Sequence, residues 1–378
     1  MLGYHLENFL EGYARIVLNY TCILLKKFRH ATILNDNGYG INLPDILLTL
    51  CKSFIGEEYL RFIDIREVKQ ISLLQVYLEE LLGKLLSEDV IFVGWRPNVH
   101  ISILLNKRAK ALIIPTYSRN YTKSLLKSLR LIKNMNTPII VLNPYISCKL
   151  DSFTFLKQHP PINSLFFEVG HYVIERRFVS DGVVYRFMGR LHPFRGYKEA
   201  VIAFKKFKSR CPSTKTKLVI DSFSEDIRDE EVRKIRICDD VYIILWNPLY
   251  IIKKGLASTA KILDEIVKKY ATSSYILLPY MSWQFIEPPL VLLEALATGS
   301  FVVTSDLMKP FINDEVTYSV SREKIVEDLV KAYEYLYEIY DSNYYWSIRR
   351  KAYEYALKNF SFDAVYNKVF NVLGDVLD

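Results

Sequence analysis

Short apolar runs alternate with longer segments of helical period along nearly the whole 378-residue chain. The pattern predicts strands over ten runs: 31–34, 60–64, 89–94, 111–115, 138–142, 183–189, 217–221, 241–246, 275–279 and 300–304. Segments between them carry apolar residues at three- and four-residue spacing, which is typical of amphipathic helices: 7–28, 44–54, 70–86, 120–134, 195–210, 254–270, 288–298 and 322–339. This alternation predicts βαβ units and parallel sheets, and therefore an α/β fold.

Ten strands are too many for one compact sheet in a chain of this length, which favours two domains. The best break lies in residues 144–180, where Pro144, Pro160, Pro161 and Gly170 cluster and no strong strand or helix pattern persists. We therefore expect two Rossmann-like domains joined near residue 175.

Composition excludes several classes of protein. Half of the residues are hydrophobic and 24% are charged, which excludes a disordered chain. Because no run reaches the roughly 20 apolar residues of a membrane span and no secretory signal is visible, we expect a cytoplasmic protein. Five widely spaced cysteines predict reduced thiols and no zinc site. The formal charge of +8 favours anionic partners without naming them.

The first segment with a chemical signature is residues 183–207. A buried strand ends at Gly189, a loop carries Arg190 and Arg195, and Gly196 opens an amphipathic helix. Ligands bind at the carboxyl ends of strands in α/β sheets, and a helix N-terminus there supplies N–H groups to an anion. Two guanidinium groups beside it suit a diphosphate. The alternative is a surface turn with two solvated arginines.

The second such segment is residues 275–306. A buried strand is followed by a loop, by Pro288 at a helix start, and by the helix LVLLEALA, which Gly299 ends. Glu294 lies inside this apolar helix, where a carboxylate needs hydrogen-bond donors from a ligand or from the protein. Glu287 precedes it by seven residues and so falls on the same side of a helix. The alternative is one solvent-facing glutamate and one paired with a core arginine.

Together the two segments resemble the retaining nucleotide-sugar glycosyltransferases of the GT-B fold, specifically glycosyltransferase family 4. That family has a GR…KG loop after the first strand of its C-terminal domain, and a Glu-x7-Glu element with an EAxAxG helix end about a hundred residues later. This chain has Gly189-Arg190 and Arg195-Gly196, then Glu287, then the helix end from Glu294 to Gly299. The resemblance is strong over residues 183–306 and generic in the first 150 residues.

The resemblance implies a GT-B fold, in which two Rossmann-like domains face each other across a cleft. It implies an acceptor domain over residues 1–175, a nucleotide-sugar donor domain over 176–359, and a last helix, about 360–378, that packs back on the first domain. The implied activity is transfer of a hexosyl group from a nucleotide sugar with retention of anomeric configuration, without a cofactor or a metal ion. The chain has no Asp-x-Asp motif of the kind that metal-dependent GT-A enzymes use.

Residue by residue, the resemblance implies that Arg190 and Arg195 bind and stabilise the donor diphosphate and that Glu294 binds the ribose hydroxyls. Glu287 would act at the donor sugar. The remaining donor-binding positions are Gly189, Phe285, Ile286 and Pro288.

The chain departs from the family pattern in ways that keep a second function open. Its two glutamates enclose six residues instead of seven, Arg195 stands where the family has lysine, and the stretch from Asp89 to Trp95 lacks the family's histidine. His100 follows a few residues later, on an apolar segment where a packed core histidine is the alternative to an acceptor-site residue. A catalytically inactive sugar-nucleotide-binding or scaffold protein is therefore the alternative to an enzyme.

A basic segment in the N-terminal half suggests a further partner. Residues 107–133 hold eight Lys and Arg and no acidic residue, and within 119–134 several of these basic residues recur at three- and four-residue spacing with leucines between them. Such a helix could lie on the inner face of a membrane, or it could be an ordinary solvated helix face. The acceptor stays open among glycan, lipid and protein. No nucleic-acid-binding motif is present, so we expect no nucleic-acid partner.

Overall fold

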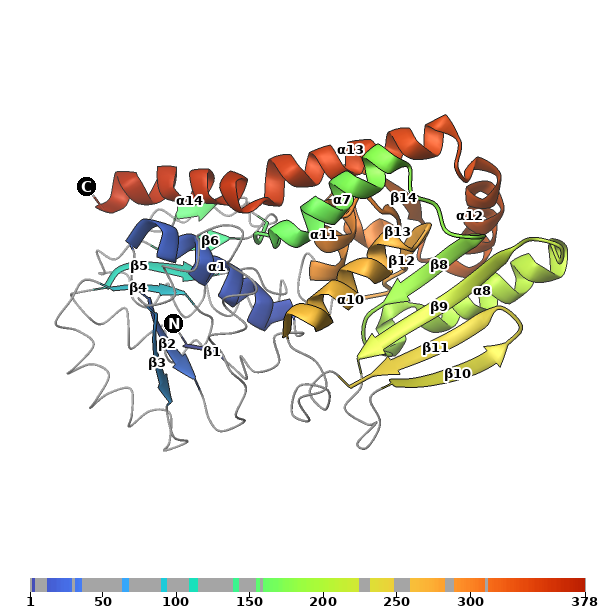
Figure 1. Cartoon of the computed structure of the whole chain (residues 1–378), viewed down its shortest axis with the longest axis horizontal. Coiled ribbons are helices and arrows are strands. Elements are labelled where there is room, and N and C mark those ends of the chain that lie inside the picture. Colours follow the sequence, from blue (N-terminus) through green and yellow to red (C-terminus); the bar gives the residue numbers. More distant parts are fainter. Residues whose placement is uncertain are drawn as a thin grey trace. The chain divides into compact units, whose positions relative to one another are not determined.

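The computed structural model describes residues 2–3, 12–28, 31–35, 63–67, 90–93, 109–114, 139–142, 154–156, 159–223, 232–247, 259–282, 289–309 and 312–377. The chain divides into two compact units. Unit 1 comprises Met1–Asn163 and Asn359–Asp378, and unit 2 comprises Ser164–Lys358. Figure 1 labels the helices and strands of both units.

Unit 2 contains one seven-stranded sheet in the order β10-β11-β9-β8-β12-β13-β14. Its strands are β8 (Val183–Met188), β9 (Thr216–Phe223), β10 (Val232–Cys238), β11 (Val241–Trp246), β12 (Tyr275–Leu278), β13 (Phe301–Ser305) and β14 (Thr317–Val320). All neighbouring pairs are parallel except β10 and β11, which form an antiparallel hairpin at one edge. The mostly parallel α/β sheet expected from the sequence is confirmed, whereas β10 and β14 were not predicted.

Helices cover both faces of this sheet (Figure 1). They are α7 (Ser164–Arg176), α8 (Tyr197–Arg210), α10 (Thr259–Ala271), α11 (Leu290–Ala297), α12 (Ile325–Ile339) and α13 (Asn343–Phe360). Phe204 of α8 and Leu329 of α12 pack in one core with Tyr185 and Leu218 of the sheet. On the opposite face, the ring of Phe166 on α7 lies 5.8 Å from that of Tyr270 on α10. Because helices cover both faces of the sheet, its central strands are apolar along nearly their whole length.

Helix α7 corrects the expectation that residues 144–180 lack a helix. Its buried positions, Phe166, Phe167, Gly170, Val173 and Ile174, follow helical spacing. Gly170 does not break the helix; it allows α7 to approach α11 closely, because a Cβ at Gly170 would lie 2.3 Å from the Ala297 carbonyl oxygen.

Buried tyrosines join the sheet of unit 2 to α12 and α13. The Tyr185 hydroxyl donates to the carbonyl oxygen of Tyr333 at 2.9 Å, and the Tyr275 hydroxyl donates to that of Leu336. Tyr345 on α13 donates in the same way to Ser274, at 3.1 Å. Each phenol therefore buries its ring while its O–H finds a main-chain acceptor, as a buried hydroxyl requires.

The described strands of unit 1 form two parallel sheets. One has the order β1-β2-β3 and the other β4-β5-β6-β7. Their bounds are β1 (Leu2–Gly3), β2 (Ala31–Asn35), β3 (Ile63–Glu67), β4 (Val90–Val93), β5 (Ala109–Ile114), β6 (Ile139–Leu142) and β7 (Thr154–Leu156). Four of the five strands predicted for this half are present, the fifth, predicted at 60–64, lies three residues later as β3, and β1 and β7 are additional.

Helix α1 (Gly12–Phe28) contacts the last helix, α14 (Phe362–Leu377), within unit 1. The Lys26 ammonium lies 3.3 Å from an Asp363 carboxylate oxygen and 5.3 Å from the centre of the Tyr366 ring. The backbone N–H of Ile162 donates to the carbonyl oxygen of Phe360 at 2.8 Å, which adds the end of α13 to the same unit.

The cysteines differ in part from the expectation that all five are reduced. Cys22, fully buried on α1, is disulfide-bonded. Cys211 and Cys238 are free thiols, as predicted.

Candidate functional site

The loops that follow β8 and β12 meet at the carboxyl end of the unit 2 sheet. From β8 the chain proceeds to β9 on one side, whereas β12 lies on the other side of β8 and leads away to β13. This reversal of strand order is the topological switch point at which open α/β sheets bind ligands. The backbone N–H of Met281, after β12, donates to the carbonyl oxygen of Phe194, in the loop after β8, at 2.8 Å.

Two glycines of this loop have conformations that disfavour any other residue. Gly189 has a φ of +141°, and a Cβ placed on it would lie 2.6 Å from a terminal nitrogen of Arg195. Gly196 has a φ of +73°, and its Cβ would lie 2.0 Å from the carbonyl oxygen of Pro279. Because Gly196 is the N-cap of α8 and has no side chain, the start of the helix lies directly against the end of β12.

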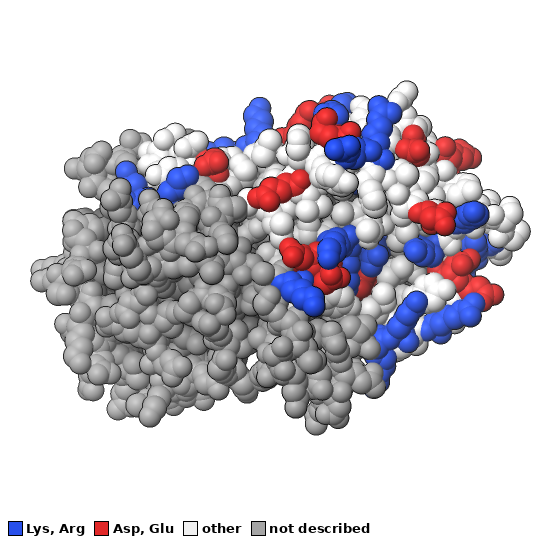
Figure 2. Space-filling view, viewed as in Figure 1, with Lys and Arg blue, Asp and Glu red and all other residues white. Residues whose placement is uncertain are grey.

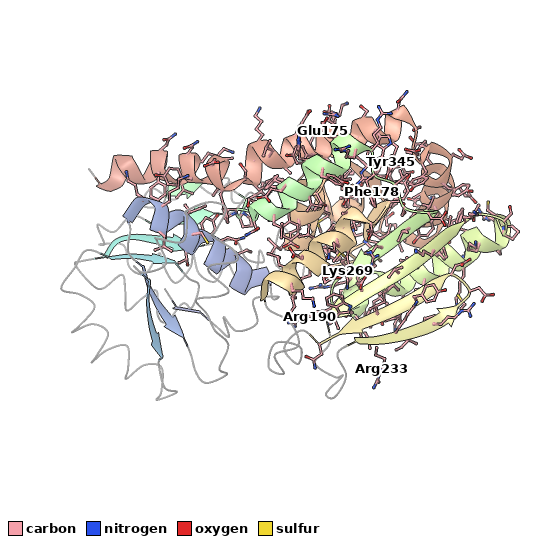
Figure 3. The ribbon with its side chains drawn as sticks, in the orientation of Figure 1. Glu175, Phe178, Arg190, Arg233, Lys269 and Tyr345 are labelled. Carbon is pink, nitrogen blue, oxygen red and sulfur yellow. The ribbon has the colours of Figure 1, made fainter. Side chains whose placement is uncertain are left out.

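The structure brings Gly189 and Arg195 together. The Arg195 guanidinium is half-buried and lies 5.8 Å from the centre of the Tyr280 ring. Burial raises the pKa of Tyr280, and the positive charge of Arg195 acts in the opposite direction. Arg190 is exposed, and Figure 3 places it beyond the tips of the strand arrows. Arg195 is thus partly buried, whereas Arg190 is exposed at the end of the sheet.

Glu294 is buried on α11, with 2% of its surface exposed. Its Oε2 accepts a hydrogen bond from the hydroxyl of Tyr270 at 2.9 Å. The protein therefore supplies one of the donors that a carboxylate in this apolar helix needs. The helix starts at Leu290 and Gly299 follows its end with a φ of +62°, as the proline and glycine pattern predicts.

The other predicted site residues lie outside the described residues. They are Phe285, Ile286, Glu287 and Pro288 of the donor segment, together with His100. Of the basic segment 107–133 the structure describes residues 109–114, which form strand β5 and not part of a helix.

A buried ion cluster lies beside the β8 loop and was missed from the sequence. Arg186 on β8 forms an ion pair with Asp221 on β9, and its Nε donates to the Ser273 hydroxyl at 2.7 Å. The Lys269 ammonium lies 2.6 Å from the other Asp221 oxygen and 3.1 Å from the centre of the Trp246 ring. The backbone of Asp221 also accepts from the N–H of Gly189 at 3.0 Å, which connects the cluster to the loop.

A charged residue inside a buried strand was the signal that could have revealed this cluster. Arg186 interrupts the apolar run VVYRFM, and Asp221 ends KLVID on the next strand. Their registers, Arg186 with Val219 and Met188 with Asp221, place both side chains on one face of the sheet.

The pKa of Lys269 predicts a pH-dependent stability. Burial lowers this pKa to about 8, against the opposing effect of the Asp221 carboxylate, whereas an unfolded lysine titrates near ~10.4. Between these values the unfolded chain binds a proton that the folded protein lacks, so the contribution of Lys269 to the free energy of unfolding increases with pH, by up to about 1 kcal/mol per pH unit.

Urea denaturation of the wild type and of Lys269→Met at pH 7.5, 8.5 and 9.5 measures this effect. The unfolding free energy of the wild type minus that of Lys269→Met should increase as the pH rises. A difference that stays constant over the three pH values would contradict the lowered pKa. The other titrating groups are the same in both proteins, so their effects on the unfolding free energy cancel in the difference.

Neither a metal cluster nor a membrane-spanning helix is found in the described part of the chain. It contains no group of three His, Cys, Asp or Glu side chains placed to hold a metal ion. None of its helices is long and apolar enough to cross a membrane.

No protein-family model matches the chain, and no curated protein matches it either. Among solved structures, a glycosyltransferase from Rickettsia africae ESF-5 has a TM-score of 0.60 at 14% identity, over 100% of this chain and 97% of that one. HepE of Anabaena, solved in complex with UDP-glucose, has a TM-score of 0.56 at 12% identity, over 91% and 99%. Sucrose-phosphate synthase from Thermosynechococcus elongatus has a TM-score of 0.50 at 14% identity, over 81% and 80%. These neighbours are GT-B proteins, and the chain has the same α/β fold.

Proposed function

We propose that this protein is a glycosyltransferase of family 4 type that moves a hexosyl group from a nucleotide sugar to an acceptor hydroxyl with retention of configuration. The observation that carries the proposal is the loop from Gly189 to Gly196. It lies at the switch point of the sheet, carries two arginines, and opens α8 against the end of β12. Structures with the same fold include HepE, which was solved with UDP-glucose.

In the proposed reaction the donor diphosphate lies over this loop. Arg190 and Arg195 bind its oxygens, and the N-terminus of α8 adds its positive dipole end. As the bond between the anomeric carbon and the β-phosphate oxygen breaks, negative charge grows on the leaving group, and these fixed positive groups stabilise it. The acceptor oxygen then bonds to the anomeric carbon on the same face, and its proton passes to the departing phosphate. The reaction thus needs no metal ion.

Glu294 is proposed to bind the ribose hydroxyls, with Tyr270 holding the carboxylate in place. Glu287, Phe285, Ile286 and Pro288 would face the donor sugar, with Glu287 acting during transfer. The acceptor can be a glycan, a lipid or a protein.

Replacing Arg195 with alanine tests the diphosphate assignment. Because a hydrogen bond to a charged group contributes about 1.5–3 kcal/mol, donor affinity should fall by roughly 10- to 100-fold. Isothermal titration with UDP-glucose and a panel of other nucleotide sugars measures it. Arg210→Ala is the matched control, since Arg210 lies at the far end of α8 and pairs with Glu334 at 3.1 Å. Equal affinity in the wild type and Arg195→Ala would refute the assignment.

Turnover separates the enzyme from the inactive alternative. The release of nucleoside diphosphate from the sugar nucleotide that binds, with and without candidate acceptors, should be detectable for the wild type. Binding without release for any acceptor would favour a sugar-nucleotide-binding or scaffold protein.

A further inference from the structure

The outward face of α8 is a stripe of basic residues around an exposed isoleucine. Ile202 lies four residues after Lys198, Lys205 and Lys206 lie three and four residues after Ile202, and all four side chains are exposed. Arg210 continues the stripe at the end of the helix. Ile202 exposes 49% of its surface, whereas the opposite side of α8 is buried in the core. The stripe therefore has no packing role in unit 2.

The β10–β11 hairpin extends this basic surface. The Lys208 ammonium, on α8, lies 3.0 Å from an Asp240 oxygen in the hairpin turn, so the two elements are adjacent. Ile235 is in register with Ile243, and Ile243 packs against the core that α8 covers, which places Ile235 on the α8 side of the sheet. Ile235 is 38% exposed, and Ile237, at an irregularity of the strand, is 42% exposed.

The surface is strongly positive. Helix α8 has five basic residues and one acidic residue, Glu199, which is half-buried. Of the three basic residues of strand β10, Arg233 lies on the same side of the sheet as Ile235, whereas Lys234 and Arg236 lie on the opposite face. Figure 2 shows Lys and Arg side chains gathered along this hairpin, at the lower right. Among the described residues, three acidic side chains pair with basic residues of α8 and β10: Asp239 with Arg236, Asp240 with Lys208 and Glu334 with Arg210.

We propose that the α8 stripe and β10 together bind the surface of an anionic phospholipid membrane. Lysines and arginines complement the negative headgroups, and the three exposed isoleucines between them can enter the boundary with the acyl chains. A nucleic acid would use the charge but gain little from the isoleucines. This membrane contact lies in unit 2 and is independent of the basic segment 107–133.

Flotation of the full chain with lipid vesicles tests the proposal. One set is pure phosphatidylcholine, and the other contains about one third phosphatidylglycerol. The wild type should float with the anionic vesicles, remain behind with the neutral ones, and bind less as salt rises, because salt screens the surface charge. Equal binding to both vesicle types, or to neither, would overturn the proposal.

Variants locate the contact. Reversing charge in Lys205→Glu/Lys206→Glu should lower the partition coefficient at least about 20-fold, and Ile202→Ser should lower it by about 5-fold. The matched controls are Lys351→Glu/Lys358→Glu and Leu357→Ser on α13, which change exposed residues of the same kinds. All of these side chains are exposed, so thermal unfolding should be unchanged.

Two results with the variants would refute the proposal. The first is vesicle binding that persists in Lys205→Glu/Lys206→Glu, which would assign lipid binding to another part of the chain. The second is a loss of the same size in the α13 controls, which would mean that total charge alone decides binding. If the α8 variant instead loses affinity for single-stranded DNA and keeps its lipid binding, the surface is a polyanion site.

Discussion

Gly196→Ala is expected to destabilise unit 2 by more than about 2 kcal/mol and to lower donor affinity about 100-fold. Alanine at a φ of +73° costs about 1 kcal/mol or more, and its Cβ would lie 2.0 Å from the carbonyl oxygen of Pro279. Because that oxygen belongs to the backbone, β12 and α8 must separate. The arginine loop then moves, and a displacement of about 1 Å can reduce activity by two orders of magnitude.

Gly182→Ala is the matched control for this prediction. Gly182 also has a positive φ, +84°, and its Cβ would lie 2.8 Å from the carbonyl oxygen of Lys215, at the start of β8 and away from the loop. Both variants should lose stability in urea denaturation, but only Gly196→Ala should lose donor affinity in titration of the folded protein. Equal donor affinity in the two variants would contradict the role of Gly196 in the site.

Asp221→Asn is expected to cost about 3–5 kcal/mol of unfolding free energy. The substitution removes the carboxylate between Arg186 and Lys269 and leaves the buried Arg186 guanidinium and the Lys269 side chain without their counter-ion. Breaking a buried ion pair from one side has effects of this size. The loss should appear as a lower urea midpoint with an unchanged slope.

Two comparisons make the Asp221 prediction specific. Asp239→Asn removes the acid of the exposed pair with Arg236 and should change stability very little. The triple variant Arg186→Met/Asp221→Leu/Lys269→Met replaces the charges with apolar groups and should recover most of the stability lost in Asp221→Asn. An Asp221→Asn protein as stable as Asp239→Asn would show that the cluster does not need its negative charge.

Local patterns predicted ten of the fourteen described strands, because buried strands stand out as apolar runs in the sequence, but they missed β1, β7, β10 and β14. The run ending at Gly189 and the helix end at Gly299 follow from apolar period and glycine alone. Gly170 was misread because its reason is tertiary: α11 lies against it. Glu294 pairs with Tyr270, and Arg186 pairs with Asp221. The partners in each pair come from different elements, and only the folded unit brings them within hydrogen-bond distance.

The contacts across the switch point also bear on the order of folding. Phe194 and Gly196 are held by Met281 and Pro279, which follow them by more than eighty residues in the chain. Contacts of such long sequence separation require the closure of a large loop and form slowly. During synthesis, the arginine loop therefore leaves the ribosome well before the strand that gives it its shape. A chain that stops before β12 would contain both arginines without the turn that positions them.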